Sequence, residues 1–88
     1  MNDPENDRYV GFYANDKPLP PDNDYHLTLD EYLMVLEGQI TIKILPDGPS
    51  ATYREGDMAY LPGDTHINLT LDRLPYKESF VMIPTEEA

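Results

Sequence analysis

Residues 31–45 read EYLMVLEGQITIKIL, and this stretch indicates an all-β chain. QITIKIL alternates cleanly, with Ile40, Ile42 and Ile44 on one face and Thr41 and Lys43 on the other. A period of two is typical of a half-buried strand. EYLMVL is apolar on both faces, as expected for a strand between a barrel interior and a second buried surface such as a dimer interface. We therefore expect two strands that meet at the turn signal before QITIKIL.

Short β runs separated by turn residues continue on both sides of this stretch. Residues 45–49 (LPDGP) have turn chemistry, so residues 50–54 are expected to return as a hairpin. Further strand-like runs are YVGFY, HLTL, DMAYLP, HINLTL and KESFVMI. Residues 14–24 contain three prolines and predict a loop, while residues 1–8 and 84–88 are expected to be flexible. No pattern supports a long helix.

Length and charge exclude several classes of protein. Eighty-eight residues allow one domain with a modest core, so oligomerisation is expected, and the doubly apolar strand favours a homodimer. A net charge of -11 disfavours nucleic acid and anionic membranes as partners. No apolar run is long enough to span a bilayer and no signal peptide pattern is present, so a cytoplasmic location is expected. Without cysteine, any metal must use nitrogen and oxygen ligands.

The candidate site is built around the two histidines of the chain. Glu31 follows His26 by five residues, and His66 begins the run HINLTL. Two imidazoles and one carboxylate form the facial triad of non-haem metal sites that keep open positions for substrate. We therefore predict that His26, Glu31 and His66 bind one divalent metal ion, either iron, manganese, nickel, cobalt or zinc. Asp24 is a fourth ligand, an acceptor for an imidazole N–H, or a loop cap.

Glu31 carries a further expectation of its own. It opens the most apolar strand and shares a face with Leu33 and Val35. A carboxylate buried on such a face needs a partner. HINLTL also alternates, and its polar and apolar faces are formed respectively by His66, Asn68, Thr70 and by Ile67, Leu69, Leu71.

Two motifs in this chain resemble those of the cupin superfamily. The first family motif is His-x-His, three or four residues, Glu, six residues and Gly; here it is DYH, LTLD, Glu31, YLMVLE and Gly38, with Asp24 in place of the first His. The second is Gly, five residues, Pro-x-Gly, two residues and His; here it is Gly56, DMAYL and PGDTH, one residue short after Pro62. The resemblance implies a double-stranded β-helix, a jelly-roll-like barrel, with His26, Glu31 and His66 as metal ligands.

The wording of the motifs is most similar to that of 3-hydroxyanthranilate 3,4-dioxygenases, which share DYH, EGD and LP. That family binds its substrate carboxylate with arginines, where this chain has Asp22 and Thr70. An acidic or neutral side chain does not bind an anionic acid in this way. The resemblance therefore extends to the ligand set and not to the substrate.

Three functions are compatible with these patterns. The first is a metal-dependent enzyme of dioxygenase, isomerase or lyase type that acts on a small oxygenated molecule. The second is a non-catalytic cupin that binds or senses a small molecule, and the third is a vestigial cupin retained for assembly. Four tyrosines either pack or line a pocket, namely Tyr25, Tyr32, Tyr53 and Tyr60. Gly38, Gly56 and Gly63 are expected at turns that need positive φ or close backbone approach.

Overall fold

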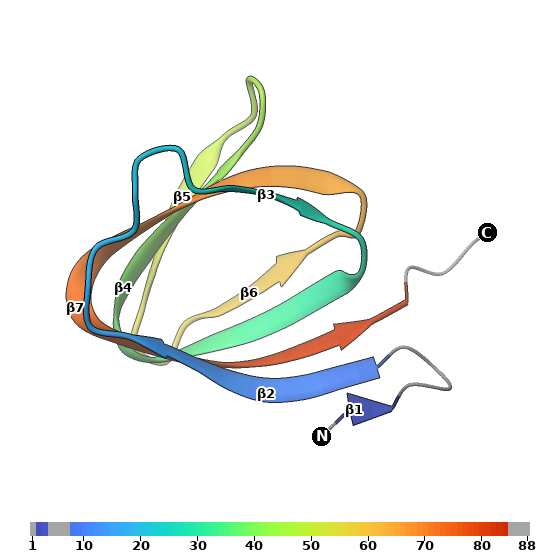
Figure 1. Cartoon of the computed structure of the whole chain (residues 1–88), viewed down its shortest axis with the longest axis horizontal. Coiled ribbons are helices and arrows are strands. Elements are labelled where there is room, and N and C mark those ends of the chain that lie inside the picture. The colour runs from blue at the N-terminus through green and yellow to red at the C-terminus, as the bar shows by residue number, and fades with distance from the viewer. Residues whose placement is uncertain (1, 4–7, 85–88) are drawn as a thin grey trace.

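The computed structural model describes residues 2–3 and 8–84, and it confirms the all-β prediction. Figure 1 shows the strands in chain order, with bounds β1 Asn2–Asp3, β2 Arg8–Asn15, β3 Asp24–Leu27, β4 Asp30–Ile44, β5 Ser50–Arg54, β6 Met58–Leu61 and β7 Thr65–Ile83. The described part of the chain has no helix long and apolar enough to cross a membrane.

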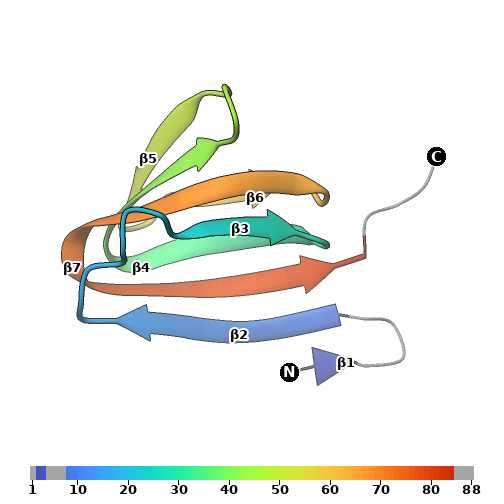
Figure 2. The same ribbon diagram turned by 45° about the horizontal axis from the view of Figure 1, so that its top comes forward.

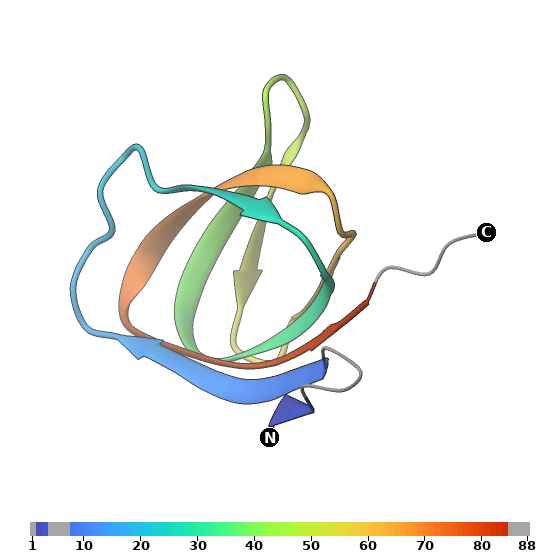
Figure 3. The same cartoon turned by 45° about the vertical axis from the view of Figure 1, so that its right-hand side comes forward.

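Two long antiparallel strands, β4 and β7, form the centre of the fold. Their pairing runs from Asp30 opposite Ile83 to Ile44 opposite Ile67. Because both strands bend midway, each contributes to two walls that face one another (Figures 2 and 3). The β2/β6 wall contains β2, the second half of β7, the first half of β4, and β6. The β3/β5 wall contains β3, the first half of β7, the second half of β4, and β5.

The bend in β4 depends on Gly38. The pairing of β4 with β7 shifts register three times between Val35 and Ile40. Gly38 lies within this region with a φ of 85°, and a Cβ there would lie 2.5 Å from the carbonyl oxygens of Arg73 and Pro75. A residue with a side chain would be strained in conformation and would collide with β7. The predicted need for glycine is therefore confirmed at this position.

The face that points inward changes at the bend. Leu33 and Val35 are buried before Gly38, whereas Ile40 and Ile42 are buried after it. The same change occurs in β7, where odd-numbered residues from Ile67 to Leu71 and then even-numbered residues from Tyr76 to Phe80 face inward. Each long strand thus keeps an apolar face toward the interior on both sides of its bend. The runs EYLMVLEG and QITIKIL are two halves of β4, and HINLTL and KESFVMI both lie in β7.

The remaining local predictions can be compared with the strands. Residues 50–54 return as β5 and pair with β4, so the predicted hairpin is confirmed. The segment between β2 and β3 has no strand, as the prolines predicted. Asn2 and Asp3 pair with Tyr9 and Arg8, which differs from the expected frayed start. The expected flexibility of residues 1, 4–7 and 85–88 lies outside the described residues.

Candidate functional site

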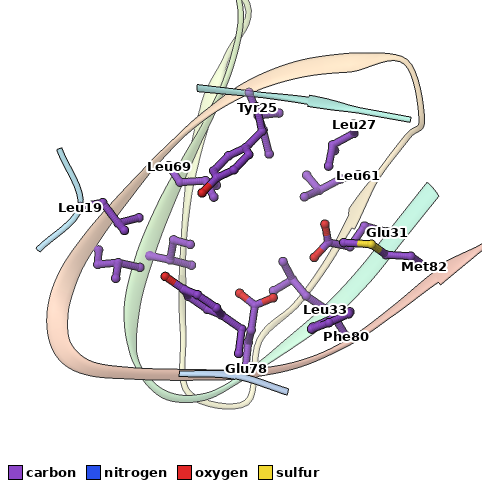
Figure 4. Close-up of a pocket in the computed structure, with 14 residues that line it drawn as sticks. Leu19, Tyr25, Leu27, Glu31, Leu33, Leu61, Leu69, Glu78, Phe80 and Met82 are labelled. Carbon is purple, nitrogen blue, oxygen red and sulfur yellow. The ribbon is translucent and has the colours of Figure 1, made fainter. Parts of the chain in front are cut away.

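The barrel interior contains a cavity of about 270 Å³ between the two walls. Figure 4 shows side chains from β3, β4, β6 and β7 pointing into it. Most of its lining is aliphatic or aromatic, including Leu27, Leu33, Leu61, Leu69 and Phe80. A concave, mainly apolar cavity with a few polar groups is the usual form of a small-molecule site. The polar groups of this cavity therefore determine which kind of ligand it can bind.

Two carboxyl groups project into this apolar cavity, Glu31 from β4 and Glu78 from β7 (Figure 4). They are 7% and 6% exposed. The hydroxyl of Tyr76, which is 1% exposed, donates a hydrogen bond of 2.7 Å to Oε1 of Glu78. The expectation that Glu31 would be buried and would need a partner is met, because the Glu31 carboxyl is hydrogen-bonded to that of Glu78. We call these three residues the carboxyl cluster.

Burial controls protonation in the carboxyl cluster. Desolvation, followed by the charge of Glu78 and the hydrogen bond to it, raises the pKa of Glu31 to about 7. Desolvation also raises the pKa of Glu78, although the hydrogen bonds from Tyr76 and Glu31 oppose this rise. The pKa of Tyr76 is raised as well, chiefly by burial, so its hydroxyl remains a donor. The Glu31 carboxyl therefore keeps its proton up to about pH 7, while the hydrogen bonds that Glu78 accepts favour the charged form of Glu78.

The two histidines lie on the other side of the barrel wall. His26 in β3 pairs directly with His66 in β7, and their rings stack with centroids 4.2 Å apart and planes 3° from parallel. Nε2 of His26 is 2.8 Å from Oδ1 of Asp64. Both imidazoles are exposed on the outer face of the β3/β5 wall. Glu31, by contrast, faces the interior, so the wall separates it from both histidines.

Asp24 also lies on the outer face, where its Oδ1 accepts a hydrogen bond of 2.8 Å from Nδ2 of Asn68. The same amide nitrogen donates to the carbonyl of Pro21, so this contact holds the loop that precedes β3. Within residues 2–3 and 8–84, no three histidine, aspartate or glutamate side chains are grouped so that they could hold a metal ion. The structure does not bring the four predicted ligands together, and they do not fit one shared ion.

The first cupin motif fits the structure when three residues, rather than four, precede Glu31. The two family histidine positions then fall on Tyr25 and Leu27, and Gly38 keeps its place. Tyr25, Leu27 and Glu31 all line the cavity. Because side chains alternate along a strand, a shift of one residue exchanges the inner and outer faces. Of these three inward positions, only the glutamate has a metal-ligating side chain.

The second motif has its full length once Asp64 is placed at the glycine of Pro-x-Gly. Asp64 has a φ of 61°, the left-handed conformation that glycine adopts most readily. After two intervening residues the family histidine position falls on Ile67, which lines the cavity. Gly63 has no positive φ, and its N–H donates to Oδ1 of Asp30 at 2.6 Å. With Asp64 at the glycine position, the second motif has the family spacing without a missing residue.

Sequence reasoning did not identify Tyr76 and Glu78 as site residues. Both lie on the inward face of β7, in the alternating series that continues through Phe80 and Met82. The sequence did contain one signal: the glutamate of KESFVMI falls on the apolar face of that strand, as Glu31 does in EYLMVL. Two carboxylates on the apolar faces of paired strands predict a buried acidic pair.

The tyrosines with predicted packing or pocket roles divide between the two sides of the wall. Tyr25 lines the cavity, and Tyr53 packs against the core. Tyr32 and Tyr60 stack on the outer face of the β2/β6 wall, with ring centroids 4.8 Å apart. Packing is therefore their main role, apart from Tyr25.

Comparison with known proteins gives structural likeness without sequence matches. No family model and no curated protein matches the chain. A Methanocaldococcus jannaschii RmlC-like cupin with a double-stranded β-helix fold is 16% identical, with a TM-score of 0.71 over 88% of this chain and 70% of that one. A Rhizobium leguminosarum protein of unknown function is 21% identical, with a TM-score of 0.72 over 89% and 71%.

The EutQ protein of Clostridium difficile is also similar, with 20% identity and a TM-score of 0.68. The match covers 91% of this chain and 59% of EutQ, so this chain spans less than two thirds of that protein. At these identities the comparison establishes the fold. The double-stranded β-helix predicted from the motifs is confirmed.

Proposed function

Since the chain has the cupin fold but keeps only a glutamate at the family's metal positions, we propose that it is a small-molecule-binding cupin that does not use those positions for a metal. The ligand would occupy the barrel cavity and place a cationic or hydrogen-bond-donating head group against Glu31 and Glu78. The observation that carries this proposal is a buried carboxyl pair inside an otherwise apolar cavity of about 270 Å³. Such pairs oppose folding unless a partner compensates them.

The size of the cavity limits the ligand. Apolar cavities of about 150 Å³ accept a benzene ring, so 270 Å³ accommodates an aromatic ring or a branched aliphatic group with a short head group. Leucine, isoleucine and phenylalanine side chains would contact the apolar part of such a ligand. Burial of this part supplies the affinity, while the carboxyl cluster selects the head group.

The charge of the cluster favours one class of head group. Glu31 loses its proton as the pH passes about 7, hydrogen bonds favour a negative charge on Glu78, and the Tyr76 hydroxyl already donates to Glu78. A ligand ammonium group would neutralise this charge, whereas a ligand carboxylate would be repelled. The net charge of -11 acts in the same direction by attracting cations to the molecule.

The experiment compares three small aromatic probes that differ in the charge of the head group, benzylammonium, benzyl alcohol and benzoate, in NMR titrations of the whole chain. We expect benzylammonium to bind most tightly, with a Kd on the order of a millimolar for so small a ligand. Its affinity should increase from pH 5.5 to pH 8, because Glu31 loses its proton as the pH passes its raised pKa, about 7. Binding of benzyl alcohol should change little over this range.

A matched pair of variants separates the cavity from general charge attraction. Glu31→Gln and Glu37→Gln each remove one carboxylate from β4, the first inside the cavity and the second on the exposed surface. Benzylammonium affinity should fall about tenfold in Glu31→Gln, equivalent to about 1.4 kcal/mol, and should be unchanged in Glu37→Gln. Equal affinity for all three probes, or equal losses in the two variants, would contradict the proposed head-group selection.

A further inference from the structure

The segment between β2 and β3 forms part of the lining of the barrel cavity. We call this segment, residues 16–23, the strap. Of the described residues that line the cavity, Leu19 in the strap is the only one that lies outside a strand. Its side chain is partly buried, packs against the core and is directed at the cavity (Figure 4). The strap is therefore the only loop that contributes to the lining.

Exposure of the lining residues shows where the cavity meets solvent. Tyr13 and Tyr25 are 38% and 48% exposed, whereas the other lining residues are buried or partly buried. Tyr13 is in β2 and Tyr25 is in β3, so the two exposed lining residues lie on either side of the strap. A lining residue that is also exposed lies at the opening. The strap, which runs from β2 to β3 along one side of the barrel, therefore spans this opening (Figure 3).

The strap is stiff in its middle and tied to β7 near β3. Its three prolines each fix φ, so the middle of the strap has little freedom to change shape. Nδ2 of Asn68 donates a hydrogen bond of 3.0 Å to the carbonyl of Pro21, and the N–H of Leu69 donates one of 3.2 Å to the carbonyl of Asn23. The part that carries Leu19 is held against the barrel by apolar packing. A stiff segment of this kind moves as one unit about its ends.

One polar group opposes the closed position of the strap. Nδ2 of Asn23 is buried and has no hydrogen-bond partner among the described residues. An unpaired buried amide donor costs free energy, and it would regain hydrogen bonds to water if the strap lifted. Packing of Leu19 thus favours the closed position, whereas the amide of Asn23 favours the open one. The difference between these two effects sets how often the strap opens.

We propose that the strap is a lid that opens and closes the barrel cavity, and that Leu19 and Asn23 set the equilibrium between its two positions. The remaining lining residues belong to paired strands, so the strap is the part of the lining that can move without breaking strand pairing. A ligand that reaches Glu31 and Glu78, which are 7% and 6% exposed, has to pass this opening. Control of ligand access rests on the proposed function, but the motion itself needs no ligand.

Reaction of a thiol inside the cavity measures the opening. The chain has no cysteine, so Ile67→Cys places a single thiol among the buried lining residues. Methyl methanethiosulfonate, a small neutral reagent, converts the thiolate into a methyl disulfide and releases methanesulfinate, and mass spectrometry gives the rate. The rate should change little up to about 1 M urea, because lifting the strap exposes much less surface than unfolding the chain.

Two substitutions in this background should change the rate in opposite directions. Leu19→Ala should react about tenfold faster, because the lost packing favours the open strap. Asn23→Leu should react about fivefold slower, because an apolar group of similar shape replaces the unpaired amide. The control Thr41→Val removes an outer-face hydrogen bond of 2.8 Å to Thr52, between β4 and β5, and should react at the unchanged rate. A slower reaction cannot result from a general loss of stability.

A rate that rises with urea as steeply as the unfolded fraction would overturn the proposal, because the thiol would then react in the unfolded chain. It would also be overturned by an unchanged rate in Leu19→Ala or Asn23→Leu, or by an equal acceleration in Thr41→Val. If far-UV CD shows that Ile67→Cys does not fold, Leu61→Cys in β6 places the thiol on another part of the lining. The reaction needs no ligand, so a protein that binds benzylammonium but fails these tests would contradict the lid alone.

Discussion

The Glu31→Gln substitution is expected to stabilise the protein above neutral pH. Glutamine has nearly the shape of the protonated glutamic acid and can donate an N–H to Glu78, but it cannot acquire the buried negative charge. The wild-type chain must either keep a proton on Glu31 or bury a second charge beside Glu78. The glutamine of the variant does not titrate, so the free energy of unfolding of the variant should depend less on pH.

The pKa of Glu31 gives the magnitude. Its value is raised from 4.5 to about 7 in the folded protein, which corresponds to about 3 kcal/mol of stability. That contribution is present in full below pH 4.5, where the unfolded chain is also protonated, and is lost as the pH rises through 7. Since the Glu31 carboxyl is hydrogen-bonded to Glu78, we expect Glu31→Gln to be more stable than wild type by about 1–3 kcal/mol at pH 8.

Urea unfolding of both proteins at pH 5 and pH 8 provides the test. The difference between the two free energies of unfolding should be small at pH 5 and should favour the variant at pH 8. Comparison of the two proteins cancels the pH dependence of the surface carboxylates, which they have in common. Parallel pH dependences, or a less stable variant at pH 8, would show that Glu31 does not titrate as a buried member of the carboxyl cluster.

Four further substitutions test other parts of the structure. In thermal unfolding, Gly38→Ala should lower the free energy of unfolding by about 3 kcal/mol or more, because its Cβ would collide with two carbonyl oxygens 2.5 Å away. Gly56 also has a positive φ but no atom within 4 Å of the position that a Cβ would take, so Gly56→Ala is the control and should cost about 1 kcal/mol in the same experiment. Tyr76→Phe removes the buried donor of the Glu78 carboxylate, so it should lower the free energy of chemical unfolding by about 1–3 kcal/mol. It should also raise the pKa of Glu78, which carboxyl-carbon NMR can follow. An unchanged pKa would contradict this role of Tyr76. His66→Ala should cost less than about 1 kcal/mol and should leave both the metal content, measured by elemental analysis, and benzylammonium binding as in wild type, because His66 lies on the outer face.

The sequence was sufficient to predict the strands but not to place one motif on the correct face. Alternation within HINLTL assigned Ile67 and Leu69 to the apolar side, and the structure places both in the cavity. The motif alignment instead selected His66, one residue away. In the second motif either Gly63 or Asp64 can be aligned with the glycine of Pro-x-Gly, and because side chains alternate along a strand, the two alignments place the histidine position on opposite faces of the wall. The hydrophobic phase was the more reliable guide here.

Contacts between distant segments were harder to predict. Glu31 was expected to be buried and in need of a partner, but the identity of that partner depends on how β4 and β7 pair. Register shifts near Gly38 set this pairing, and they result from local geometry that the sequence indicates only as a turn. Asp64 is a second example. Its left-handed conformation is the one expected of the glycine in the family motif, but the residue type alone does not indicate that conformation.

The most direct test of the account is a methyl-resolved NMR map of where benzylammonium binds. The proposal predicts that the methyl groups of Leu27, Leu33 and Ile67, which line the cavity, will shift with a single saturating Kd. The methyl group of Met58 and the imidazole signals of His66, both on outer faces, should not change. Shifts confined to the outer faces, or interior methyl groups that remain unchanged at saturating ligand, would contradict a binding site inside the barrel.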